Sequence, residues 1–91
     1  MSITPDEYEH LVASMLRGEG WEATVTPASH DFGLDVIAVR AGIRLGVQAK
    51  MYLAANRPVN AATVMLTYGA AAYADCSRCM IVTDGRILDD A

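Results

Sequence analysis

The sequence "GLDVIAVRAGIRLGVQAK", residues 33–50, decides the fold of this chain. Its two halves are rich in β-forming residues and are separated by the dipeptide Ala41–Gly42, so the stretch predicts two strands joined as a hairpin. The stretch also places Asp35 inside an apolar run and ends on Lys50, which is the only lysine of the chain. A functional interpretation therefore has to explain an acid and the single lysine on two adjoining strands.

The residues on either side of the hairpin predict an α/β domain. A helix is expected to begin at Pro5, with Thr4 as its N-cap and Glu7 completing a capping box, and to end near Gly18. The other expected elements are strands at 21–26, 34–40 and 43–52, a helix at 61–74 and a strand at 79–83. The order is therefore α-β-β-β-α-β, and the second helix forms a crossover to a parallel last strand, which makes the central sheet mixed.

Length and composition indicate one small domain that has a partner. The chain has 91 residues, which suffices for a single domain over residues 1–91, yet 53% of them are hydrophobic. The helix at 61–74 is apolar nearly all round, which is typical of a helix buried on more than one side. We therefore expect a homodimer that buries this helix.

Charge and hydropathy narrow the class of protein. The net charge of −4 gives no general attraction for nucleic acid, so DNA binding would need a local basic patch or a metal ion. No apolar run approaches the roughly 20 residues that span a bilayer. The N-terminus has the pattern of a capped helix, and not that of a signal peptide, so a cytoplasmic protein is expected.

Two cysteines, Cys76 and Cys79, form a C-x-x-C pair. A redox pair of this spacing usually opens a helix, whereas this one follows a helical pattern and enters a strand. A zinc site would need two further ligands at similar spacing, which the two histidines do not provide. Two reduced, half-buried thiols are expected.

The hairpin register brings three polar side chains together. A two-residue loop places Asp35 opposite Gln48, and places Lys50 opposite Gly33 and diagonal to Asp35 on the same face. Directly opposed side chains lie about 5 Å apart and diagonal ones about 7–8 Å. The register therefore predicts a patch that combines a carboxylate, an amide and an ammonium group.

Two interpretations of this patch are open. The first is a buried ion pair between Asp35 and Lys50, but desolvation offsets much of the Coulomb gain of such a pair. The second is a site for metal-assisted phosphodiester hydrolysis, which we favour. A carboxylate and the amide oxygen of Gln48 are suitable ligands for a hard cation such as Mg²⁺. Lys50 can orient the attacking water or neutralise charge that grows on the phosphate.

In this order, the motifs resemble the Mrr-like branch of the PD-(D/E)xK restriction endonuclease superfamily. Residues 8–26 are similar to its opening helix and first strand, "SHDFGLDVIAV" (29–39) to its acidic motif, and "VQAK" (47–50) to the Q-x-K variant of its lysine motif. Residues 60–85 resemble the helix and strand that follow. The resemblance implies a restriction-endonuclease-like three-layer core and Mg²⁺-dependent cleavage of DNA, with Mn²⁺ as an alternative cofactor.

The resemblance also assigns roles by position. Asp35 and Gln48 would be metal ligands, together with the backbone carbonyl of Ala49, and Lys50 would be the catalytic lysine. Glu9, which lies at the edge of the apolar stripe of the first helix, would be an auxiliary catalytic acid.

Four residues are weaker candidates. Asp31 falls on an acidic position of the same loop and would support the site, and its neighbour His30 is a candidate for proton transfer. Arg44 shares the strand face of Gln48 and Lys50 and is a candidate for phosphate contact, with Arg57 as a looser one. A loop histidine and exposed arginines also occur without any such function.

The leading hypothesis is a homodimeric, Mg²⁺-dependent endodeoxyribonuclease. A catalytically inert, dimeric or DNA-associated module of the same fold is the main alternative. A junction-resolving nuclease is another, although such enzymes usually carry an acid where Gln48 stands. Family members commonly carry a separate DNA-recognition domain, so a specificity domain or subunit is a further expected partner.

Overall fold

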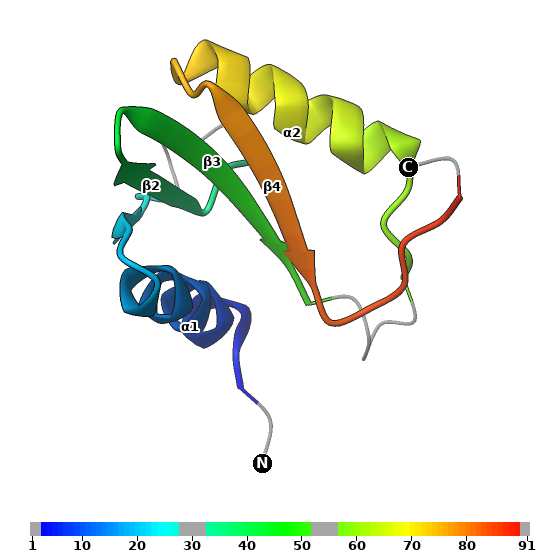
Figure 1. The fold of residues 1–91 in the computed structure, drawn as a ribbon. Helices are drawn as coiled ribbons and strands as arrows, with labels where there is room; N and C mark the ends of the chain where they lie inside the picture. Colours follow the sequence, from blue (N-terminus) through cyan, green and yellow to red (C-terminus); the bar gives the residue numbers. More distant parts are fainter. Residues whose placement is uncertain (1–2, 28–32, 52–56, 90–91) are drawn as a thin grey trace.

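The sheet and its two helices follow the predicted order. The structure is a computed structural model that describes residues 3–27, 33–51 and 57–89. Its elements are α1 (Pro5–Gly18), β1 (Glu22–Val25), β2 (Val36–Arg40), β3 (Ile43–Lys50), α2 (Ala61–Tyr73) and β4 (Arg78–Thr83). The described strands form one sheet in the order β1-β2-β3-β4, antiparallel except for the parallel pair β3–β4. With α1 on one face and α2 on the other, the α/β class and mixed sheet are confirmed (Figure 1).

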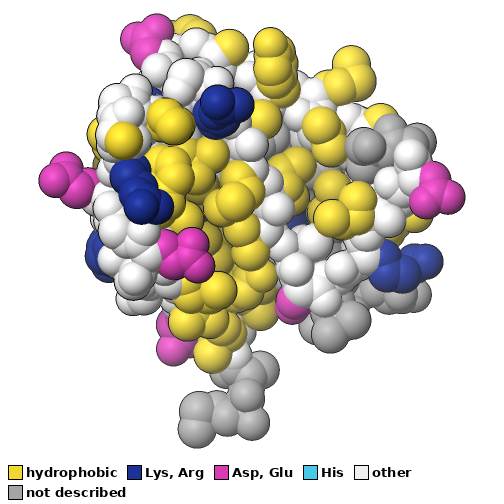
Figure 2. All heavy atoms as spheres, viewed as in Figure 1, with side chains coloured by type: hydrophobic (Ala, Val, Ile, Leu, Met, Phe, Trp, Pro, Cys, Tyr) yellow, Lys and Arg dark blue, Asp and Glu magenta, His cyan; other side chains and the backbone are white. Residues whose placement is uncertain are grey.

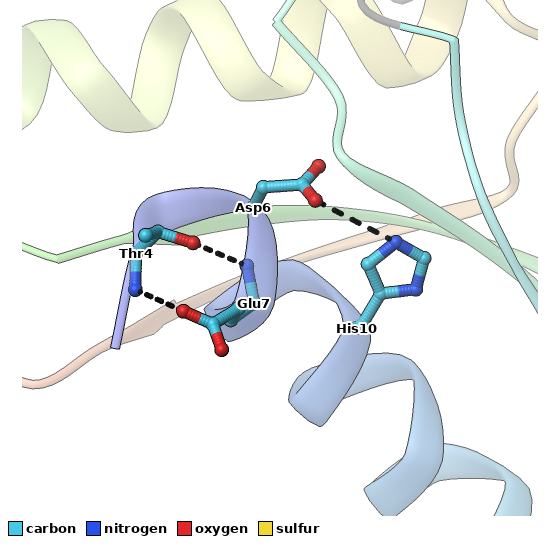
Figure 3. Close-up of polar contacts among 4 residues, drawn as sticks. All are labelled: Thr4, Asp6, Glu7 and His10. Carbon is cyan, nitrogen blue, oxygen red and sulfur yellow. Dashed lines mark hydrogen bonds and ion pairs between the residues drawn. The ribbon is translucent and has the colours of Figure 1, made fainter. Parts of the chain in front are cut away.

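Helix α1 begins with the predicted capping box. The amide of Glu7 donates to the Thr4 hydroxyl over 3.1 Å, and the amide of Thr4 donates to the Glu7 carboxylate over 2.9 Å (Figure 3). The bond from the Thr4 backbone, followed by the contact with the Thr4 side chain, lowers the pKa of Glu7. One turn further along, His10 lies 4.0 Å from Asp6, an exposed contact of the kind that contributes little to stability.

From Arg40 to Val36, the β2–β3 hairpin has the register that the sequence predicts. Ala41 and Gly42 have φ angles of 50° and 80°, as the two central positions of a type I′ turn require. Arg40 therefore pairs with Ile43, and regular pairing continues to the Val36–Val47 pair. This match fixes which side chains of β3 face α1 and which face α2.

Regular pairing ends at the Val36–Val47 pair and does not reach Asp35, because the chain forms a bulge there. The amide of Asp35 donates over 2.8 Å to the carbonyl of Val47, the residue that already lies opposite Val36. Two residues of one strand thus face one residue of the next, so the prediction that Asp35 lies directly opposite Gln48 is wrong. The carbonyl of Asp35 accepts from the amide of Thr26 over 2.9 Å. Strand β2 is therefore shorter than the predicted 34–40, and β3 likewise ends at Lys50 before the predicted 52.

Each face of the sheet has its own apolar cluster. The larger cluster joins α1 to the sheet through Val12, Ala13, Leu16, Ala23, Val36, Ala38, Leu45 and Val47. The smaller cluster joins Ala70 and Ala71 of α2 to Leu34. Gly46 makes this second contact close, because a Cβ atom there would lie 3.1 Å from Leu34 and 3.2 Å from the sulfur of Cys76.

Helix α2 ends in a Schellman motif. The amide of Cys76 donates to the carbonyl of Ala71 over 2.8 Å, and the amide of Asp75 donates to the carbonyl of Ala72 over 3.2 Å. Asp75 occupies the left-handed position, with φ of 60°, where glycine is the usual residue. Both cysteines are free; Cys76 is half-buried as expected, whereas Cys79 is exposed.

The outer side of α2 is exposed in the single chain, so its burial in a homodimer stays a prediction. The sequence predicts burial on more than one side, but in the described part of the chain only Thr67, Ala70 and Ala71 of this helix are buried. Small side chains seat the helix on the sheet along one narrow stripe, and the large apolar residues point away from it. Within the described ranges, neither helix has the length and apolarity needed to cross a membrane.

Candidate active site

A buried carboxylate–amide pair lies where β2 and β3 meet. The Oδ2 atom of Asp35 accepts hydrogen bonds from Nε2 of Gln48 at 2.8 Å and from the backbone amide of Ala49 at 2.7 Å. Asp35 is 9% exposed and Gln48 is 7% exposed. Among the described residues no donor contacts Oδ1 of Asp35, so the two bonds fix the carboxylate through one oxygen and leave the other available.

The pair lies at the edge of a pocket of about 310 Å³ between the sheet and the start of α2. The pocket is lined by Gly33, Gln48, Lys50, Arg57, Thr63, Leu66 and Thr67. Gln48 and Lys50 are two residues apart on β3 and therefore project to the same face, as predicted. Asp35 is not part of the lining and contacts it through Gln48.

Among the described residues, the charged side chains that line this pocket are basic, whereas the whole chain is acidic. Lys50 and Arg57 line it, and no acidic residue of the described ranges does. The first turn of α2 carries no acid, and the Asn60 side chain caps it by accepting from the amide of Thr63 over 3.1 Å. Because a helix N-terminus carries partial positive charge, the helix adds to the field of the two cations. The wall formed by Lys50 and Arg57 therefore suits an anionic group.

Sequence reasoning missed the wall that α2 contributes. Thr67 is buried, and its hydroxyl donates to the carbonyl of Thr63 over 2.9 Å. Together with Leu66, these residues recur at the three- and four-residue spacing of one helix face, which was the available signal. The sequence assigns Gly33 no role beyond its place in the register. Gly33 has a φ of 103°, which residues with a side chain rarely adopt, and a Cβ atom there would lie only 3.1 Å from Oε1 of Gln48. Both facts explain why the residue is glycine.

Two predicted residues lie away from the pocket. Arg44 shares the strand face but lies six residues from Lys50, about 20 Å along the strand. Its guanidinium donates to the carbonyl of Ala74 over 3.2 Å, at the end of α2. Glu9 is half-buried on α1, which covers the opposite face of the sheet, and it is not among the residues that line the pocket.

Glu9 nevertheless belongs to a part of α1 that lies near the end of β4. Burial, followed by the charge of Asp84, raises the pKa of the neighbouring Tyr8. Asp84 directly follows β4, whose last residue, Thr83, pairs with Lys50. The remaining predicted residues, His30 and Asp31, lie outside the described residues.

The donor atoms of this region suit a hard cation. The described residues contain no group of three or more His, Cys, Asp and Glu side chains that could hold a metal. The candidate donors are the oxygens of Asp35, the amide oxygen of Gln48 and backbone carbonyls. Mg²⁺ keeps several waters and commonly takes only one or two carboxylates from a protein, so this oxygen set fits it.

Comparisons with known proteins agree with the fold. A family model described as a restriction endonuclease (Mrr_cat) matches residues 1–91. A crystal structure of AF1548, a protein of unknown function, superposes with a TM-score of 0.75 at 20% sequence identity, over 90% of this chain and 48% of that one. The chain thus spans about half the length of that structure, and the likeness shows the fold alone. No curated protein matches the chain. Because the family match runs from the first residue to the last, the chain belongs to the Mrr_cat family of restriction endonuclease domains.

Proposed function

We propose that the chain is a Mg²⁺-dependent endodeoxyribonuclease that hydrolyses phosphodiester bonds in DNA, with Mn²⁺ as an alternative cofactor. One observation carries the proposal: Asp35 and Gln48 form a hydrogen-bonded pair at the wall of a pocket that also contains Lys50. The family match supports the nuclease class. The positive lining of the pocket supports a phosphate-containing substrate.

The cation would be held by oxygen atoms around this pair. Oδ1 of Asp35 and Oε1 of Gln48 are the proposed side-chain ligands, with the carbonyl of Ala49 beside them. Glu9 and Asp31 are proposed as auxiliary acids that add negative charge. When bound, the cation supplies Lewis acidity toward the phosphate and lowers the pKa of a bound water.

The residues of the chain have distinct tasks in this scheme. Gln48 and the amide of Ala49 hold the Asp35 carboxylate in one orientation, so no reorientation is needed during the reaction. Lys50 is a compact point charge that donates hydrogen bonds to a phosphate oxygen and neutralises charge that develops there. Arg57 is proposed to hold the phosphate backbone at the other side of the pocket, and Arg44 to contact it further along the sheet.

Plasmid cleavage in Mg²⁺ or Mn²⁺ tests the proposal. Asp35→Asn and Lys50→Ala should each reduce the cleavage rate by roughly 100-fold or more. Asp75→Asn and Arg78→Ala, which alter exposed charged residues outside the pocket, are matched controls and should cleave as the wild type does. Equal rates in all five proteins would show that the pocket is not the active site. If calorimetry detects no Mg²⁺ binding to the wild-type protein, the result would favour the catalytically inert module. Cleavage confined to branched DNA would favour a junction-resolving nuclease.

We further propose that the nuclease acts as a homodimer, because two copies of one site can address the two strands of a duplex. A separate specificity domain or subunit is proposed to supply sequence recognition. Sedimentation velocity of the pure chain tests the first proposal, since a monomer at micromolar concentration would contradict it.

A further inference from the structure

The basic pocket adjoins an apolar groove on the outer side of α2. The groove has a volume of about 330 Å³ and is lined by Met65, Leu66, Gly69, Ala70 and Tyr73. Leu66 lines both the pocket and the groove, so the two are neighbours. Leu66 is 75% exposed and Tyr73 is 72% exposed. Apolar side chains protrude over α2 at the top of Figure 2.

The pocket and the groove together form one surface that is basic at one end and uncharged at the other. The pocket contributes Lys50 and Arg57, whereas α2 carries no charged residue from Ala61 to Tyr73. A helix rises 1.5 Å per residue, so the groove around Gly69 is centred roughly 5–10 Å from the pocket wall formed by Thr63 and Leu66. The surface therefore fits a ligand whose anionic group is joined, over a short distance, to a flat apolar group.

We propose that this surface binds one unpaired nucleotide of the DNA substrate. Its phosphate lies in the pocket against Lys50 and Arg57, and its base lies in the groove against Leu66 and the ring of Tyr73. An aromatic ring beside a basic groove is the combination by which proteins bind single-stranded nucleic acid without strong sequence preference. The identification of the ligand as DNA rests on the proposed function.

The substrate class follows from this placement. A base inside a duplex is stacked on both faces and cannot leave the stack without an energetic cost. A nucleotide whose base enters the groove must therefore be single-stranded, mismatched or extruded. The domain accordingly prefers DNA that is unpaired beside the cleaved bond.

A matched pair of substitutions isolates the groove. A Cβ added at Gly69 meets no atom within 4 Å, and the same holds for Gly18 at the end of α1, on the other face of the sheet. Gly69→Leu therefore fills the groove without a clash inside the monomer, and leucine favours the helix, so the variant should fold. Gly18→Leu adds the same side chain at an equally open position and is the control.

The experiment measures binding of a fluorescent single-stranded oligonucleotide in EDTA, where cleavage does not interfere. A fully abasic oligonucleotide of equal length presents the same phosphates without bases. The wild type should bind the strand with bases more tightly by roughly 5- to 150-fold, the range for stacking of one base. Gly69→Leu should remove this preference, Gly18→Leu should keep it, and Arg57→Ala should weaken both ligands alike.

Several outcomes would overturn the inference. They are equal affinity of the wild type for the two oligonucleotides, an unchanged preference in Gly69→Leu, or a change of mass in Gly69→Leu with no change in affinity. The last outcome would identify the groove as the interface of the expected homodimer, which would then bury α2 as the sequence predicts. An inactive protein that still prefers bases would contradict only the proposed nuclease, and an active one without the preference would contradict only this inference.

Discussion

Gln48 donates through Nε2 to Oδ2 of Asp35 across 2.8 Å, and this bond joins β3 to the bulge that precedes β2. The amide of Ala49 donates to the same oxygen, so one atom of the carboxylate satisfies two buried donors. The other carboxylate oxygen is the one proposed to bind a cation. Structural and chemical roles therefore fall on different atoms of one side chain, and substitution can separate them.

Asp35→Asn and Asp35→Ala should differ in stability while both lose cleavage. The amide oxygen of asparagine still accepts from Gln48 and Ala49, so the free energy of unfolding should change little. Alanine leaves two donors without an acceptor and should cost about 1–3 kcal/mol. Urea denaturation of the two variants and the wild type measures the difference. Equal stability of the two variants would show that the hydrogen bonds carry no weight.

Gln48→Glu should make stability depend on Mg²⁺. The variant loses the donor to Asp35 and sets a second carboxylate beside it, so without metal its free energy of unfolding should fall by about 1–3 kcal/mol. A bound cation neutralises this repulsion, so Mg²⁺ should raise the Tm of the variant more than that of the wild type. KCl at equal ionic strength controls for screening. Equal Tm shifts in the two proteins would contradict a cation site here.

Asp75→Gly should stabilise the domain. Asp75 holds a φ of 60° in the Schellman motif, and a residue with a Cβ is strained there whereas glycine is not. The greater freedom of glycine in the unfolded chain offsets part of this gain, so we expect about 0.5–1 kcal/mol. Thermal denaturation measures the effect. Asp75→Asn should be nearly neutral and Asp75→Val destabilising; a stabilised valine variant would contradict the account.

Glu7→Gln should remove part of the acid sensitivity of the fold. The pKa of Glu7 lies below its ordinary value of 4.5 in the folded chain, because the charged carboxylate accepts hydrogen bonds from Thr4. Its stabilising effect is therefore complete above pH 4.5 and is lost as the pH falls through the lowered pKa.

Melting curves at pH 7 and pH 3 check this expectation. The Tm of Glu7→Gln should fall less between the two values than that of the wild type. Glu19→Gln, which alters the C-cap of the same helix, should follow the wild type. A wild-type pH dependence in Glu7→Gln would show that the charge of the Glu7 carboxylate does not contribute to the acid sensitivity.

Local signals were sufficient for the hairpin and its order in the fold. The turn at 41–42 and the alternation of β3 predict the register from Arg40 to Val36, and Gln48 reaches the displaced Asp35 through its side chain. The start of β2 could not be predicted in this way. The bulge at Asp35 depends on bonds to Thr26 and Val47, which lie on either side of it and are distant in sequence.

The wall of the pocket that α2 forms could not be predicted from the sequence either. The alternation of β3 places Arg44 on the same face as Lys50. Which of the two lines the pocket depends on how α2 packs across this face, because α2 covers the Arg44 end and leaves the Lys50 end accessible. The absence of a side chain at Gly46 decides how closely that helix approaches, together with the small residues of α2. These are properties of the assembled layers and not of any one segment.

The pocket is divided among separate segments of the chain, and this division has an evolutionary consequence. Gln48 and Lys50, with Asp35 bonded behind Gln48, come from the continuous stretch 33–50, whereas Thr63, Leu66 and Thr67 come from α2 and Arg57 lies between the two segments. Changes on the outer face of α2 leave the buried pairs of the hairpin untouched. Related domains can therefore change the substrate that α2 contacts while they keep the same proposed catalytic residues on the hairpin.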